Sequence, residues 1–97
     1  MPGCYADGLQ AIAFGLETSA VGDFTHAEGC ATSATGFAAH AEGDSVEAYG
    51  DFSHAEGLLV QAADDYAHAE GSLATAASYG AHAEGGGSIA GYAVKVG

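Results

Sequence analysis

The chain has 97 residues, of which thirteen are acidic and one is Lys, so its formal net charge at pH 7 is −12. This length predicts a single domain, 1–97, and the charge excludes nucleic acid and anionic lipid as partners, because phosphate groups are bound by clustered Lys and Arg. The N-terminus lacks the basic and hydrophobic regions of a signal peptide, and no apolar run is long enough to span a membrane. We therefore expect neither a leader peptide in this chain nor membrane insertion.

One tetrapeptide, His-Ala-Glu-Gly (HAEG), recurs through most of the chain. It begins at residues 26, 40, 54, 68 and 82, a spacing of fourteen without insertion or deletion, and Ile-Ala-Phe-Gly at 12–15 occupies the same phase one period earlier. Self-similarity at a fixed period is the signature of a fold whose repeated units stack on one another. We therefore predict regular 14-residue turns over about residues 12–95, preceded by an irregular N-terminal turn or cap at 1–11.

A finer period of seven runs inside the repeat. Alanine recurs every seven residues from Ala6 to Ala90, and Gly follows two residues later at ten of these thirteen positions. Heptads also mark coiled coils, but a Gly in each heptad costs about 1 kcal/mol in a helix, and one Lys cannot supply the charged pairs between such helices. The pattern therefore predicts an all-β solenoid, in which seven residues make one short strand and one tight turn.

The alternation of residue types predicts which side chains face the inside of the coil. Because residues two apart share one face of a strand, Ala27 and Gly29 point one way while His26 and Glu28 point the other. The alanines of successive half-turns then oppose each other in a narrow interior, and turns stack at about 4.8 Å through backbone hydrogen bonds. The predicted interior positions are Ala13, Ala20, Ala27, Ala34, Ala41, Ala48, Ala55, Ala62, Ala69, Ala76 and Ala83.

Large side chains recur on the outside of the predicted coil, shortly before each HAEG. An interior of Ala and Gly buries little apolar area, so we expect a single coil to need other chains for stability. A stripe of aromatic side chains on a repeat protein is a candidate interface. The aromatic residues expected to lie between chains are Phe24, Phe37, Phe52, Tyr66 and Tyr79.

Three segments carry a resemblance to a known family: Ala-Ile-Ala-Phe-Gly at 11–15, Thr-Ser-Ala-Val-Gly at 18–22 and Thr-Ser-Ala-Thr-Gly at 32–36. They resemble the head repeats of YadA-type trimeric autotransporter adhesins, and the HAEG variant is similar to repeats in phage and prophage tail-fibre proteins. The resemblance covers about residues 4–97. It implies a left-handed parallel β-roll, assembled side by side as a homotrimer, and a structural, adhesive role that includes binding to a host cell-surface or extracellular-matrix receptor.

The resemblance also implies which residues face the trimer axis. In that family an aliphatic pair packs against the other chains around the axis. Ile12 and Phe14 match these positions, and we expect them to form an apolar axis cap. The chain shows neither the coiled-coil stalk nor the membrane anchor of a complete autotransporter, so we expect a fibre segment at a cell surface or in a virion tail fibre, or an excised head.

In the next five turns His and Glu replace the aliphatic pair. We interpret them as a polar ladder along the trimer axis, in which hydrogen-bonded pairs fix the register between chains. Two alternatives stay open: three chains can gather these side chains into metal- or ion-binding rings, or the side chains can be exposed without a special role. The ladder residues are His26, Glu28, His40, Glu42, His54, Glu56, His68, Glu70, His82 and Glu84.

We do not expect an enzyme. A His and a Glu can form an acid–base pair, but no Ser or Cys nucleophile recurs beside them. We predict no cofactor, and we expect Cys4 and Cys30 to be reduced thiols. Thr-Ser at 18–19 and 32–33 raises an ice-binding alternative, which is weaker because later turns do not continue the pair. The acids that we interpret as solubilising charges near turns are Asp23, Asp44, Asp51, Asp64 and Asp65.

Overall fold

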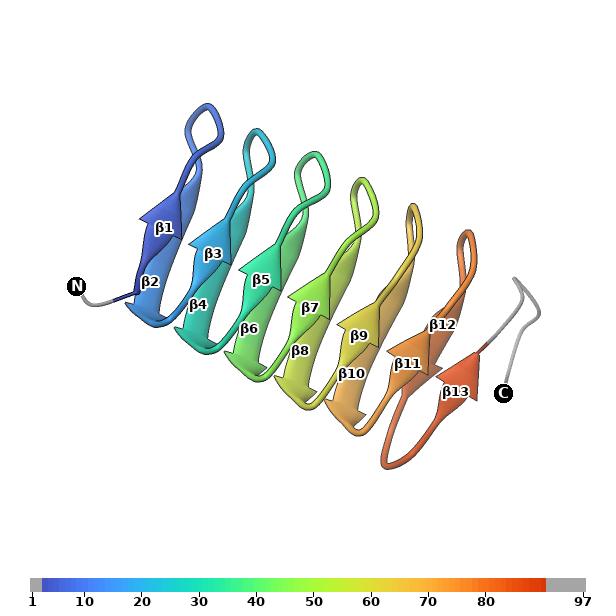
Figure 1. Cartoon of the computed structure of the whole chain (residues 1–97). Helices are drawn as coiled ribbons and strands as arrows, with labels where there is room; N and C mark the ends of the chain where they lie inside the picture. The colour runs from blue at the N-terminus through green and yellow to red at the C-terminus, as the bar shows by residue number, and fades with distance from the viewer. Residues whose placement is uncertain (1–2, 91–97) are drawn as a thin grey trace.

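The computed structural model describes residues 3–90, which form two parallel β-sheets packed against each other in one coil (Figure 1). The chain alternates between the sheets, so each turn of the coil contributes one strand to both. The first sheet contains seven two-residue strands: β1 (Tyr5–Ala6), β3 (Ser19–Ala20), β5 (Ser33–Ala34), β7 (Glu47–Ala48), β9 (Gln61–Ala62), β11 (Thr75–Ala76) and β13 (Ile89–Ala90). The second contains six longer strands: β2 (Ile12–Leu16), β4 (His26–Cys30), β6 (His40–Asp44), β8 (His54–Leu58), β10 (His68–Ser72) and β12 (His82–Glu84).

Strands pair in register with the strand one turn away in the same sheet. Ser19 lies opposite Ser33 in the first sheet, and His26 lies opposite His40 in the second. This fourteen-residue offset continues through all described pairs, so the prediction of an all-β parallel solenoid with 14-residue turns is confirmed. About six turns form a flat rod that measures 39 × 22 × 12 Å.

Small side chains fill the interior of the coil. The predicted interior alanines from Ala20 to Ala83 are 0–3 % exposed, and Ala13 in the first turn is partly buried. Two further buried columns lie at the two ends of the interior. The column before the short strands is Thr18, Thr32, Val46, Val60 and Ala74, and the column before the long strands is Thr25, Ala39, Ser53, Ala67 and Ala81. No fully buried side chain among the described residues is therefore larger than Val.

Each turn bends at two residues in the left-handed region of φ. Phe24 (φ 60°) precedes β4 and Ala31 (φ 55°) follows it, and the equivalent positions repeat this conformation in the neighbouring turns. The bend aims the amide at the preceding turn: Phe24 N–H donates to Leu9 O, and Ala31 N–H donates to Leu16 O, both over 2.8 Å. Because non-Gly residues adopt this region rarely, these hydrogen bonds between turns stabilise an otherwise unfavourable conformation.

Glycine in the long strands is required by close approach between turns. Gly57 in β8 has φ 129°, which L side chains rarely adopt, and a Cβ there would lie 1.9 Å from the carbonyl oxygen of Gly71 in the next turn. Gly43 faces Gly57 in the same way. The Gly of the first four HAEG segments therefore lets adjacent turns stack at hydrogen-bonding distance.

The repeat extends into the N-terminal segment that we expect to be an irregular cap. Within residues 1–11, Tyr5–Ala6 form β1 and pair in register with Ser19–Ala20 of β3. At the other end of the chain, residues 91–95 of the expected repeat lie outside the described residues. Among residues 3–90, no helix is long and apolar enough to cross a membrane.

Candidate functional site

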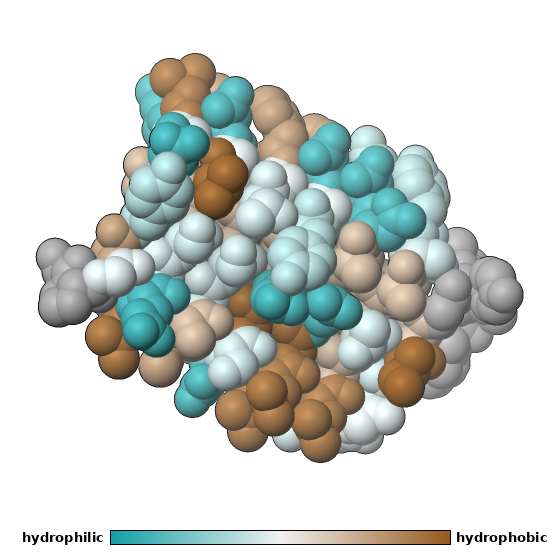
Figure 2. Space-filling view, viewed as in Figure 1, coloured by the Kyte–Doolittle hydropathy of each residue, from teal (hydrophilic) through white to brown (hydrophobic). Residues whose placement is uncertain are grey.

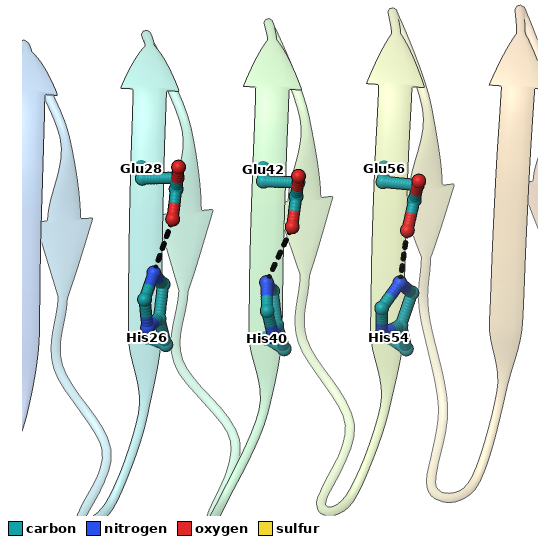
Figure 3. Close-up of polar contacts among 6 residues, drawn as sticks. All are labelled: His26, Glu28, His40, Glu42, His54 and Glu56. Atoms are coloured by element: carbon teal, nitrogen blue, oxygen red, sulfur yellow. Dashed lines mark hydrogen bonds and ion pairs between the residues drawn. The ribbon is translucent and has the colours of Figure 1, made fainter.

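The His and Glu of each HAEG form one continuous outer surface on β4, β6, β8, β10 and β12, here called the His–Glu face. The two residues are two positions apart in a strand, so both side chains point away from the interior. In every strand His Nε2 lies 2.5–2.8 Å from Oε1 of the Glu, as Figure 3 shows for three turns. The pairs are His26–Glu28, His40–Glu42, His54–Glu56, His68–Glu70 and His82–Glu84.

The imidazole rings of the His–Glu face stack along the coil. In-register pairing places each His beside the His of the next turn, and successive ring centroids are 4.6–4.9 Å apart. In the single chain the side chains of His40 and Glu42 are 36 % and 41 % exposed. The face is thus an ordered polar surface that another chain can reach. Its predicted position on a trimer axis stays a prediction.

Hydrogen bonding within the His68–Glu70 pair favours the ionised form of the Glu70 carboxyl group. The hydrogen bond with His68 lowers the pKa of Glu70 below its ordinary value. Partial desolvation opposes this effect, while the positive charge of His68 and, more weakly, of His54 and His82 adds to it. The stacked geometry therefore couples the Glu70 carboxylate to the imidazoles of its own turn and of the neighbouring turns.

Imidazole and carboxylate groups are also metal ligands, so the His–Glu face needs to be tested as an ion site. Within residues 3–90, no three side chains of His, Cys, Asp or Glu are placed to hold one ion together. In the alternative of ion-binding rings, the ligands of each ring come from three chains, and this alternative stays a prediction. The expectation that the chain is not an enzyme also stays a prediction.

Apolar side chains take the place of the polar pair in β2. Ile12 lies beside His26 and Phe14 lies beside Glu28 in the pairing of β2 with β4. Ile12 and Phe14 are both exposed, and β2 is the edge strand of its sheet. The outward positions that hold Ile12 and Phe14 in β2 therefore hold His and Glu from β4 onward. Their role as an axis cap is a prediction that a single chain does not test.

The predicted inter-chain aromatics form one row along the turns that lead into the long strands, here called the aromatic edge. Neighbouring ring centroids are 5.4–5.6 Å apart, and the residues are 42–61 % exposed. Phe37 and Tyr79 come one position earlier in their turns than the others, yet their rings remain in the row. The residues of the aromatic edge are Phe24, Phe37, Phe52, Tyr66 and Tyr79.

Three carboxylates on this side of the coil bond to the backbone as well as adding charge. Asp23 Oδ1 accepts a hydrogen bond from Leu9 N–H, and Asp51 Oδ1 accepts one from Phe37 N–H, both over 2.9 Å. Asp65 Oδ1 accepts from Asp51 N–H over the same distance. Each donor lies fourteen residues before its acceptor. The interpretation of these acids as solubilising charges therefore missed a contact between turns, which the fourteen-residue spacing could have indicated.

A second apolar row, which the sequence interpretation missed, lies on the opposite side of the coil, where the long strands end. We call it the leucine edge. Its residues are 46–56 % exposed, and Figure 2 shows strongly hydrophobic side chains gathered at the lower border of the coil. The signal in the sequence was a Leu one or two positions after the Gly of three repeats. The residues of the leucine edge are Leu16, Leu58, Leu59 and Leu73.

Comparison with known proteins identified no relative of this chain. No model of a known protein family, no curated protein and no solved structure matches the chain.

Proposed function

We propose that this chain is a structural and adhesive fibre segment: a left-handed parallel β-roll that assembles side by side as a homotrimer in a cell-surface adhesin or a phage tail fibre. One observation carries the proposal. Every Phe, Tyr and Leu among residues 3–90 is exposed, whereas the largest fully buried side chains are Val46 and Val60. A flat coil with its large apolar side chains outside presents surfaces that other chains can bury.

The His–Glu face is the surface that we place on the trimer axis. Its pairs satisfy each other within one chain at 2.5–2.8 Å, so the face can be buried without leaving a carboxylate unpaired. Ile12 and Phe14 add an apolar layer in the same columns. This arrangement supports a rod in which polar layers specify the register and an apolar layer adds buried area.

Adhesion follows from a rigid rod that presents the same surface in successive turns. Repetition lets several weak contacts act together, which raises the overall affinity for a surface that carries many receptors. The net charge of −12 favours receptor surfaces rich in Lys and Arg over anionic lipid. We therefore assign the binding role to a host cell-surface or extracellular-matrix protein.

Binding of coated beads to surfaces tests the adhesive role. Fluorescent beads carrying the chain are applied to intact cells and to immobilised matrix proteins at physiological salt. We expect saturable retention on at least one surface, with loss of retention for beads that carry Gly57→Ala, which disrupts the coil. Absence of retention on every surface, or equal retention of the disrupted variant, would contradict adhesion.

A further inference from the structure

The two apolar edges lie at opposite ends of the long strands. Each long strand starts beside the aromatic edge and ends at the leucine edge: Phe24 comes just before β4, and Leu58 is the last residue of β8. Figure 1 shows these connections as the upper and lower borders of the coil. A single coil therefore presents two different apolar rows, separated by the strands of the His–Glu face.

A threefold arrangement brings these two rows together. If three coils stand side by side with their His–Glu faces toward one axis, their long strands all run around that axis in the same sense. The end of the strands in one copy then meets the start of the strands in the next copy at each corner. We infer that the aromatic edge of each copy packs against the leucine edge of its neighbour, and this inference rests on the side-by-side assembly proposed above.

The charge distribution favours this contact over a contact between two identical edges. Asp23, Asp51 and Asp65 lie along the aromatic edge, so two aromatic edges placed together would oppose rows of carboxylates. The leucine-edge turns at Leu58–Leu59 and at 72–73 carry no charged residue, while Glu17 and Asp44 place two acids near its N-terminal end. A contact between unlike edges therefore opposes fewer acids to the carboxylates of the aromatic edge than a contact between two aromatic edges would.

The size of the edges favours a closed ring over a pair. About six turns stacked at roughly 4.8 Å and a thickness of 12 Å give each edge a face of about 350 Å², less than the roughly 800 Å² that each partner buries in a standard interface. A copy in a ring uses both edges, about 700 Å², in addition to its His–Glu face. A contact between unlike edges is also heterologous, so it can close into a ring, whereas like edges join only in pairs.

Disulfide cross-linking distinguishes these contacts because the chain already has a cysteine beside the leucine edge. Cys30 ends β4, in the position that Leu16 and Leu58 occupy in β2 and β8. Ala38 follows Phe37 of the aromatic edge, lies fourteen residues after Phe24, and already has the left-handed φ of that position. In a Cys4→Ser background, Ala38→Cys places one thiol on each edge. Two matched controls keep only one thiol: Cys4→Ser alone, and Cys4→Ser with Ala38→Cys and Cys30→Ser.

We expect the variant with both thiols to form covalent trimers after mild oxidation with diamide on a non-reducing gel, while both single-thiol controls remain monomeric on that gel. Cross-linked dimers of a single-thiol control would reveal contact between like edges and overturn the inference. A trimer by light scattering that forms no cross-link in the two-thiol variant would also overturn it while leaving the proposed assembly intact. A monomer by light scattering would contradict the assembly itself.

A second variant tests the leucine edge without new thiols. Replacing Leu58, Leu59 and Leu73 by Ser should raise the dissociation constant of the trimer by about tenfold or more, because these side chains lose their apolar partner surface. Ile89→Ser is the control, since Ile89 is 72 % exposed in β13, a strand of the sheet that does not carry the His–Glu face. Equal effects of the two changes on trimer dissociation, with unchanged circular dichroism, would contradict a role for the leucine edge.

Discussion

The inside and the outside of this coil follow opposite rules. Inside, an alanine every seven residues lets the two sheets approach so closely that no fully buried described side chain exceeds Val in size. Outside, the aromatic edge and the leucine edge hold large apolar side chains that stay 42–61 % exposed. The interior thus determines the fold of one chain through close stacking of the backbone, and the outer surface holds the side chains on which the proposed assembly depends. Variants of the two regions should separate folding from assembly.

The largest effect is expected where two turns approach most closely. Gly57→Ala forces a Cβ to within 1.9 Å of the Gly71 carbonyl oxygen at φ 129°, so unfolding free energy should fall by about 3 kcal/mol or more. Gly86→Ala is the control, because a Cβ there meets nothing within 4 Å. Urea denaturation followed by circular dichroism measures both. Similar unfolding midpoints for the two variants would show that the turns are not stacked this closely.

Overfilling the interior should have the next largest effect. Ala55 is fully buried between the sheets, so Ala55→Leu should destabilise the coil by about 1–3 kcal/mol through displacement of the surrounding backbone. Ala77→Leu adds the same side chain at an exposed position and should change the unfolding midpoint little. A tolerated Ala55→Leu would contradict the assignment of the alanine column to the interior.

Exchange of a polar pair for an apolar one should leave assembly intact. His54→Val combined with Glu56→Ile places side chains like those of Ile12 and Phe14 in the third turn of the His–Glu face, and such replacements of a complete ion pair change stability little. Glu56→Ile alone removes the acceptor of His54 and should weaken the trimer by about 1 kcal/mol. Light scattering over a dilution series compares the variants. Dissociation of the double variant alone would contradict an axial position for this face.

Acid should weaken the His–Glu face in a defined pH window. The pKa of Glu70 is lowered in the folded chain by its hydrogen bond with His68, so its contribution to stability is complete above the unfolded pKa and is lost as pH falls through the folded pKa. The melting temperature should therefore fall below about pH 5. The fall should be smaller in Glu70→Gln, which has no carboxyl group to protonate. An unchanged melting temperature from pH 8 to pH 3 would remove this role of the face.

The sequence alone was sufficient for the parts of the fold that follow from periodicity. The fourteen-residue spacing of HAEG determines that His26 lies beside His40, and the alternation along a strand places Ala27 inside and Glu28 outside. The pairing between turns and the direction of each side chain repeat along the coil, so several copies of the repeat support each prediction. The close approach at Gly57 explains why Gly accompanies Ala at the same period.

The features that could not be predicted depend on geometry between turns. Phe24 and Phe52 adopt a left-handed φ that their residue type disfavours, because their amides bond to the preceding turn. The carboxylate of Asp23 bonds to the Leu9 amide for the same reason of proximity. The leucine edge is irregular in sequence, since Leu58 and Leu73 occupy different positions of their turns, and it becomes a row only when the turns are stacked.

The mass of the chain in solution tests the central claim of side-by-side assembly most directly. Multi-angle light scattering at pH 7.5, with and without a chelator, should give about 28 kDa, the mass of three chains of 9.5 kDa. The same mass in both conditions would match a trimer held by the His–Glu face and the two apolar edges. A folded monomer of 9.5 kDa would contradict the account, and a trimer that dissociates only in chelator would show that bound ions, rather than these contacts, hold the chains together.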